Sequence, residues 1–96
     1  MKPSELIADP KKWIKGTLAR DANGRPISPY SKEAVCFCIH GAKIACGIQN
    51  TREFEDRILN AMKEIYGCDF LTIVQFNDRP TTTHEEVIRV LQKAGY

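Results

Sequence analysis

Helix-start patterns followed by apolar residues at helical spacing constrain the fold of this chain most strongly. Asn50 with Glu53, and Thr82 with Glu85, have the spacing of capping boxes, in which the first side chain accepts a hydrogen bond from the backbone at the third helical position. Gly67 is predicted to end the helix that begins at Asn50. The apolar stripes that follow the two caps are Phe54, Ile58, Leu59, Met62 and Ile65, and Val87, Ile88, Val90 and Leu91.

Weaker patterns predict three further helical segments. Ser4 is placed to cap a short helix that ends near Asp9-Pro10, and Pro10 suits the first position of another short turn. Ser31 is predicted to cap a helix that runs to about Gly47. The predicted buried face of that helix consists of Val35, Cys38, Ile39, Ala42, Ala45 and Cys46.

Strand patterns are short and few. Asn23-Gly24 predicts a type I′ turn between Leu18 and Ile27, in an edge hairpin or an ordered loop. The segment "FLTIVQF", residues 70–76, is the best strand candidate, with a further helical turn as the alternative. We therefore predict a mainly α fold: four to five short helices with one small β-hairpin or strand pair, in a single compact domain over residues 1–96.

Composition excludes several classes of protein. No apolar run approaches the roughly 18 residues of a membrane span, and the first residues lack the core of a signal peptide, so we expect a cytoplasmic protein. The net charge of +2 is too small to indicate nucleic acid. Six basic residues lie within residues 1–30, where an acidic partner or a phosphate group could meet them: Lys2, Lys11, Lys12, Lys15, Arg20 and Arg25.

The segment "KEAVCFCIHGAKIACG", residues 32–47, raises the question of a metal site. In a strand, Cys36, Cys38 and His40 would point to one side, and Cys46 or Cys68 could complete a zinc site. In a helix, where successive residues turn by about 100°, Cys36 and Cys38 diverge. Because the helix pattern is the stronger, we expect neither a metal nor another cofactor, and we expect the cysteines to be reduced and mostly buried.

A cysteine-based enzyme is a further hypothesis. Cys38 or Cys36 would be the nucleophile, His84 or His40 the base, and Asp78 or Asn77 the group that orients the base. No nucleophile turn or oxyanion loop supports this arrangement, so the sequence favours a protein that is not an enzyme.

Two polar clusters are candidates for a binding site: "GTLARDANGRP", residues 16–26, and "FNDRPTTTHEEV", residues 76–87. One hypothesis is structural, with a buried ion pair between Arg20 and Asp78 that ties the two loops together. The other is a shared pocket for an anion such as a phosphate group or nucleotide. Its predicted ligand-binding residues are Arg20, Asp21, Arg25, Asn77, Asp78 and Thr83, with Lys15 and Arg79 as further cations and Trp13 or Tyr30 for stacking.

Three segments in this order resemble a short uncharacterised domain family of bacterial, especially actinobacterial, and phage proteins: "ADPKKWIKGTLARDANGRP", "EAVCFCIHGA" and "FNDRPTTTHEEVIRVLQKA". The shared positions are Trp13, Gly16, Ala19, Arg20, Asp21, Cys38, Gly41, Ala42, Asn77, Asp78 and Thr83. The resemblance implies no established activity. It does favour an origin in a phage or mobile element, whose very small proteins often act by binding.

We therefore expect a small non-catalytic binding protein, such as a phage- or mobile-element-encoded inhibitor of a host protein. Its predicted partner-binding residues are Tyr30, Phe37 and Ile44, with Tyr96 as a further candidate, and an exposed Phe37 would also favour a homodimer. The alternatives are a protein that binds or sequesters a small anionic ligand and, third, the cysteine-based enzyme.

Overall fold

The computed structural model describes residues 1–67 and 72–96 and confirms the mainly α prediction. Within these residues the chain forms five α-helices, one 3₁₀ turn and one antiparallel strand pair. In chain order they are α1 (Pro3–Leu6), η1 (Pro10–Lys12), β1 (Ala19–Arg20), β2 (Cys36–Phe37), α2 (Ile39–Ala45), α3 (Thr51–Tyr66), α4 (Ile73–Asp78) and α5 (His84–Lys93).

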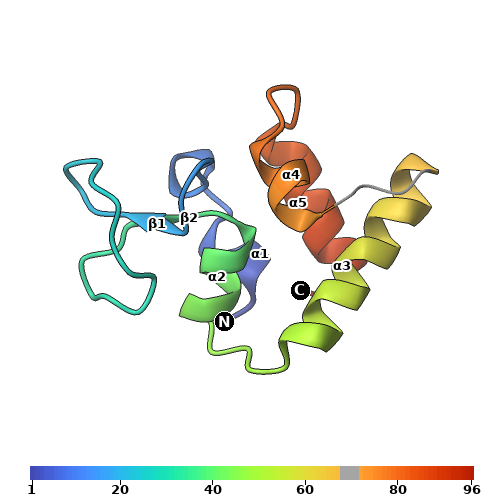
Figure 1. The fold of residues 1–96 in the computed structure, drawn as a ribbon, viewed down its shortest axis with the longest axis horizontal. Coiled ribbons are helices and arrows are strands. Elements are labelled where there is room, and N and C mark those ends of the chain that lie inside the picture. Colours follow the sequence, from blue (N-terminus) through green and yellow to red (C-terminus); the bar gives the residue numbers. More distant parts are fainter. Residues whose placement is uncertain (68–71) are drawn as a thin grey trace.

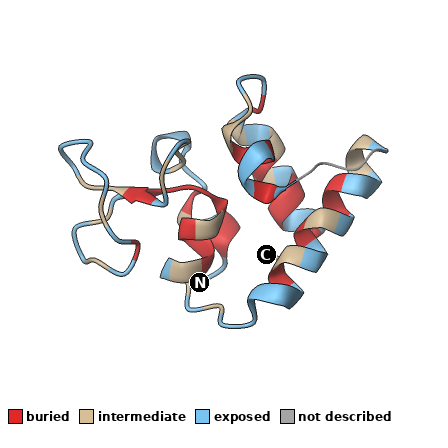
Figure 2. Cartoon of the chain, viewed as in Figure 1, coloured by how far each residue is buried: buried red, intermediate tan, exposed pale blue. Residues whose placement is uncertain are grey.

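The helices surround one hydrophobic core. Helix α3 packs on α5 and α4, α1 packs on α2 and α5, and α2 packs on α4. Figure 1 shows the strand pair and its long loops at one end of the molecule, beside α1 and α2, with α3, α4 and α5 toward the other end. Buried positions lie on α1, α2 and the inner sides of α3 and α5, as Figure 2 shows. The largest fully buried apolar side chains are Phe54, Phe76, Ile7, Ile39, Ile58, Met62, Leu91, Val87 and Val90.

The two long helices form where the cap patterns predicted them. Asn50 accepts a hydrogen bond from the backbone N–H of Glu53 at 3.0 Å, and Gly67 ends α3 with a φ of 69°. The cap of α5 is one residue later than predicted. Thr83 closes the capping box with Glu86, because the Thr82 hydroxyl is buried and accepts a hydrogen bond from Arg79 instead.

The amino-terminal helix is shorter than predicted, and its cap is different. Lys2 is the N-cap of α1, while the Ser4 hydroxyl donates a hydrogen bond to the carbonyl oxygen of Tyr96 at 2.7 Å. Pro10 begins η1 as expected, and Asp9 caps this turn by accepting from the backbone N–H of Lys11 at 2.9 Å.

The prediction of one helix over residues 31–47 is wrong for its first half. Residues 36–37 form β2, which pairs with β1 in the register Ala19↔Phe37 and Arg20↔Cys36, and α2 begins only after Cys38. Ser31 caps no helix; its hydroxyl accepts from the backbone N–H of Glu33 in a local turn. Pairing with a distant strand thus overrides the local helical pattern.

Two other local predictions are corrected. Residues 73–76 of the predicted strand are helical, as the alternative allowed, and belong to α4, which Thr72 caps by accepting from Gln75 at 3.0 Å; residues 70–71 lie outside the described residues. The turn at Asn23-Gly24 is not of type I′, because Gly24 has a positive φ of 79° and Asn23 does not. The Asp21 carboxylate organises this turn by accepting hydrogen bonds from the backbone N–H groups of Asn23 and Arg25.

Candidate functional site

Asn77, at the end of α4, joins three segments of the chain. Its Oδ1 accepts hydrogen bonds from Trp13 Nε1 at 2.8 Å and from the backbone N–H of Ile39 at 3.1 Å. Its Nδ2 donates to the carbonyl oxygen of Ile14 at 3.1 Å and to Asp78 Oδ1 at 2.9 Å. An amide has two donor hydrogens and two acceptor lone pairs, so this buried side chain has no capacity left for a ligand. Asn77 is therefore a structural link.

A hollow of about 130 Å³ lies where these segments meet. The loop before β1, the start of α2 and one side of α4 enclose it. Two of its apolar lining residues, Leu18 and Val74, leave 43% and 50% of their surfaces exposed. The lining consists of residues 16–18, Cys38, His40, Val74, Asn77 and Asp78.

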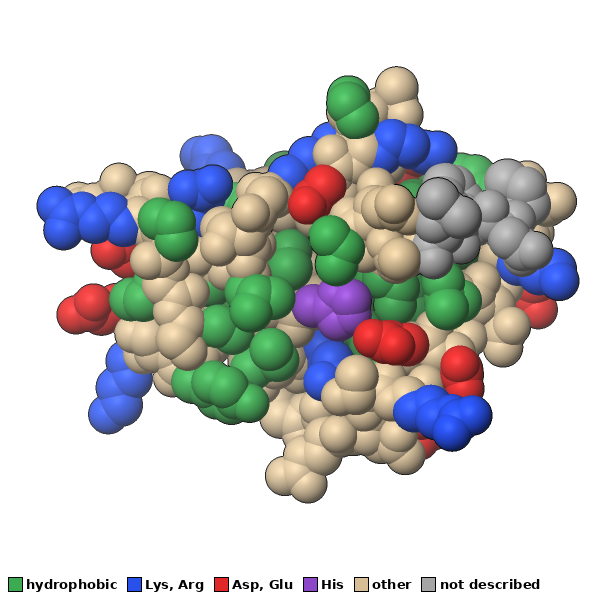
Figure 3. All heavy atoms as spheres, in the orientation of Figure 1, with side chains coloured by type: hydrophobic (Ala, Val, Ile, Leu, Met, Phe, Trp, Pro, Cys, Tyr) green, Lys and Arg blue, Asp and Glu red, His purple; other side chains and the backbone are tan. Residues whose placement is uncertain are grey.

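A second hollow, of about 300 Å³, adjoins the first and shares His40 and Val74 with it. Its other lining residues are Glu55, Leu59, Thr72 and Ile73, from α3 and the start of α4. We call the two hollows together the His40 groove. His40 Nε2 lies 3.4 Å from Glu55 Oε1. On the face drawn in Figure 3, hydrophobic side chains gather around a histidine that has one acidic and one basic side chain beside it.

Cys38 lies in the first hollow as the N-cap of α2, and its sulfur accepts a hydrogen bond from the backbone N–H of Gly41 at 3.3 Å. Burial raises the pKa of the Cys38 thiol above its ordinary value, although backbone N–H groups at the helix start partly oppose the rise. The thiol is therefore protonated at neutral pH, and a protonated thiol is a poor nucleophile.

The residues of the hypothetical cysteine enzyme only partly converge. Cys38, His40, Asn77 and Asp78 line one hollow, but the Cys38 thiol and the His40 imidazole form no hydrogen bond with each other. His84 lies elsewhere: its Nε2 contacts the carbonyl oxygen of Ile7 at 2.7 Å. Cys36 is buried, with its sulfur 3.9 Å from the carbonyl oxygen of Arg20. Across residues 1–67 and 72–96, no group of three or more His, Cys, Asp or Glu side chains is placed to hold a metal ion; Cys68 lies outside that part.

The six predicted ligand-binding residues do not form one pocket. Arg20 donates to the carbonyl oxygen of Gly24 at 3.0 Å and stays within its own loop with Asp21 and Arg25. Asp78 accepts from the backbone N–H of Gly16 at 3.0 Å, so the predicted Arg20–Asp78 ion pair is wrong. Thr83 serves as the cap of α5.

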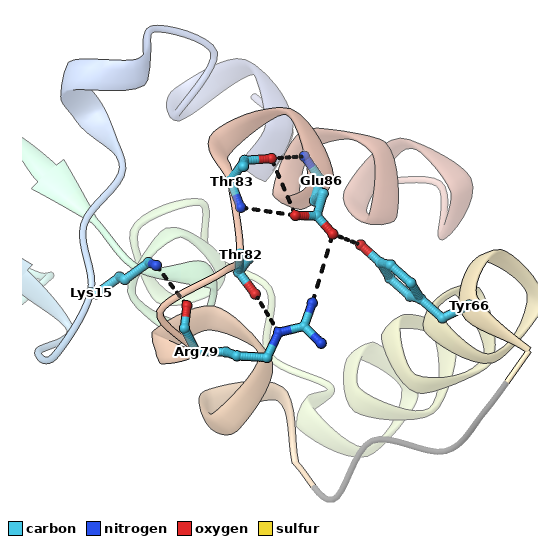
Figure 4. A network of polar contacts seen from close by, with 6 residues as sticks. All are labelled: Lys15, Tyr66, Arg79, Thr82, Thr83 and Glu86. Atoms are coloured by element: carbon cyan, nitrogen blue, oxygen red, sulfur yellow. Dashed lines mark hydrogen bonds and ion pairs between the residues drawn. The ribbon is translucent and has the colours of Figure 1, made fainter.

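A network that the sequence did not reveal joins α3, α4 and α5 (Figure 4). Tyr66 donates a hydrogen bond to Glu86 Oε2, which also lies 3.7 Å from Arg79 Nη2. Arg79 Nε donates to Thr82, and Lys15 Nζ donates to the carbonyl oxygen of Arg79 at 2.7 Å. Burial, followed by the bond to Glu86, raises the pKa of Tyr66 to about 12, and that bond in turn lowers the pKa of Glu86. Lys15 and Arg79 thus have internal partners.

The predicted partner-binding residues differ in exposure. Tyr30 is 81% exposed, and Ile44 is half-buried. Phe37 is buried in the core, so the expected exposed Phe37 face is wrong. Leu18 and Val74 were missed: Leu18 was considered only as a flank of a turn, and Val74 fell in a predicted strand.

Comparison with known proteins places the chain without giving it an activity. No curated protein and no solved structure matches it. In the structure itself, none of the helices in the described residues combines the length and apolar character that a membrane-spanning helix requires. A family model described as "Family of unknown function (DUF6197)" matches residues 3–95. The chain therefore belongs to DUF6197, a family of unknown function.

Proposed function

We propose that this protein is a non-catalytic binding protein whose His40 groove receives an apolar side chain of a protein partner. The observation that carries the proposal is the first hollow, about 130 Å³ in volume, with Leu18 and Val74 exposed beside it. Apolar side chains at a concave surface gain stability when a partner covers them. An inhibitor of a host protein, encoded by a phage or mobile element, is one specific form of this proposal.

The size and charge of the hollow favour a protein side chain over a nucleotide. Pockets for drug-sized ligands usually have volumes of about 300–1,000 Å³, whereas a cavity of about 150 Å³ holds one benzene ring, and the first hollow is close to the second of these sizes. The charged group in the first hollow is Asp78, a carboxylate that repels phosphate. The second hollow, about 300 Å³ in volume, is lined by Glu55, whose carboxylate also repels phosphate. Lys15, Arg20 and Arg79, which were expected to bind an anion, instead contact carbonyl oxygens or Glu86.

The chemistry of Cys38 argues against the enzymatic alternative. Its thiol pKa is raised, and neither the His40 nor the His84 imidazole forms a hydrogen bond with the sulfur to act as an activating base. Cys38 instead caps α2 and so helps to shape the groove.

Affinity capture with matched variants tests the proposal. The bait is the wild-type chain, a Leu18→Gln/Val74→Gln variant of the groove, or a Tyr30→Gln/Val35→Gln variant. The last replaces two exposed side chains that line neither hollow. We expect a protein from the source cells to bind the wild type and the Tyr30/Val35 variant, but not the groove variant. A partner lost only with the Tyr30/Val35 variant would place the interface on the loop between β1 and β2 and refute the proposal. Native mass spectrometry of the purified chain checks the alternative, because a retained small molecule would show as added mass.

A further inference from the structure

The charges in the His40 groove indicate what kind of segment binds there, if the proposed function holds. Among the described residues, each hollow is lined by one carboxylate, Asp78 in the first and Glu55 in the second, and by no Lys or Arg. Between them lie the shared residues His40 and Val74. The groove therefore has a valine and a histidine at its middle and one carboxylate toward each end.

Both carboxylates retain an oxygen for an incoming cation. Asp78 uses Oδ1 for its bonds to Gly16 and Asn77, and among the described residues nothing donates to its Oδ2. Glu55 uses Oε1 toward His40 and leaves 45% of its side chain exposed. An apolar surface next to a carboxylate strengthens its attraction for a cation, because fewer water molecules screen the pair.

We infer that the partner segment carries an apolar side chain with a Lys or Arg close to it in sequence. The apolar side chain occupies the first hollow, beside Leu18 and Val74. The basic side chain reaches Glu55 or Asp78. This inference rests on the proposed function and deepens it: an acidic or uncharged apolar segment would fill the same hollow but bring no Lys or Arg to either carboxylate.

A random peptide display library, selected on the immobilised wild-type chain at low salt, tests the inference. Enriched peptides are then measured for affinity against Val74→Gln and its control Val35→Gln, which replaces an exposed valine outside the groove. A second pair is Glu55→Gln and Asp56→Asn. Both remove one carboxylate from α3, but Asp56 lines a different hollow.

We expect enriched peptides to combine an apolar residue with a nearby Lys or Arg. Val74→Gln should weaken their binding about tenfold, since a lost apolar contact of this size is worth about 1.4 kcal/mol. Glu55→Gln should weaken it about two- to fivefold, the usual worth of an exposed ion pair, and added salt should have a similar effect. Val35→Gln and Asp56→Asn should leave affinity unchanged.

The possible failures are distinguishable. Two results would overturn the inference and leave the proposed function intact. In the first, the peptides lose affinity with Val74→Gln but contain no basic residue. In the second, they lose affinity with Val74→Gln, but neither Glu55→Gln nor added salt changes their affinity. Enriched peptides that bind Val74→Gln as well as wild type, or a selection without enrichment, would overturn both. A wild-type dimer in sedimentation that Val74→Gln dissociates would identify a second copy of this chain as the occupant, and would also overturn the inference of a foreign segment.

Discussion

Trp13 Nε1 donates a hydrogen bond to Asn77 Oδ1 at 2.8 Å, across 64 positions of the sequence. The same oxygen accepts from the backbone N–H of Ile39. One amide thus connects the segment after η1, the start of α2 and the end of α4, which are the three parts of the chain that enclose the first hollow. The geometry of the hollow depends on this side chain although no ligand can bind to it.

Replacement of Asn77 by alanine should therefore destabilise the fold strongly. It leaves Trp13 Nε1, the N–H of Ile39 and the carbonyl of Ile14 without their bonds, and a buried unpaired polar group costs about 1–3 kcal/mol. We expect a loss of at least about 2 kcal/mol, which corresponds to a fall in melting temperature of roughly 8–16 °C. Thermal unfolding measures it, with Asn60→Ala on the exposed side of α3 as the control. A melting temperature for Asn77→Ala close to that of Asn60→Ala would show that the amide is dispensable.

The difference between what the sequence predicted and what it missed follows the range of the interactions. Helix α3 was predicted at both ends because Asn50 and Gly67 act within a few residues of their own positions. The start of α2 was not predicted, because it depends on a distant interaction: Arg20 pairs with Cys36 across the loop between β1 and β2. Sequence clusters located Asn77 and Asp78. They did not locate the exposed Val74 or Glu55, whose positions beside His40 depend on how α2, α3 and α4 pack.

Removal of the Tyr66 hydroxyl should destabilise the junction of α3 and α5. Tyr66→Phe removes the bond to Glu86, and a partly exposed hydrogen bond to a carboxylate contributes about 1 kcal/mol, or roughly 4–8 °C in melting temperature. Tyr30→Phe is the matched control, since Tyr30 is almost fully exposed. Equal melting temperatures for the two variants at neutral pH would contradict a stabilising role for the network.

The same bond predicts a pH dependence. The pKa of Glu86 is lower in the folded chain than its ordinary value of 4.5, chiefly because Tyr66 donates to its carboxylate. A group with a depressed folded pKa contributes stability that is present above the unfolded pKa and lost as the pH falls through the folded one. The difference in stability between wild type and Tyr66→Phe should therefore be constant between about pH 5 and pH 9 and shrink below pH 4.5. A difference that grows on acidification would show that another group dominates.

Cys38 should react slowly with alkylating reagents at neutral pH. Its raised thiol pKa keeps the thiolate fraction low, and its sulfur is buried against Gly41. In a brief iodoacetamide pulse at neutral pH, read out by peptide mass mapping, we expect at least about tenfold slower labelling of Cys38 in the folded chain than in the chain unfolded in urea. Labelling should accelerate as the pH rises. If Cys38 is instead the fastest cysteine to react in the folded chain, the cysteine-enzyme hypothesis regains support.

Gly41→Ala should reverse the usual effect of this substitution in a helix. Alanine normally stabilises a helix interior by about 1 kcal/mol relative to glycine. A Cβ at position 41, however, would overlap the backbone carbonyl oxygen of Leu18, which cannot move as a side chain can. We expect a net destabilisation of about 1–3 kcal/mol, as for other overpacked sites, measured by urea unfolding.

Ala45→Gly, at the exposed last residue of the same helix, measures the propensity term without overlap and should cost at most about 1 kcal/mol. A Gly41→Ala variant more stable than wild type would show that the loop at Leu18 does not need to lie against α2. Because Leu18 lines the first hollow, the same result would argue against the rigid pocket on which the proposed binding depends.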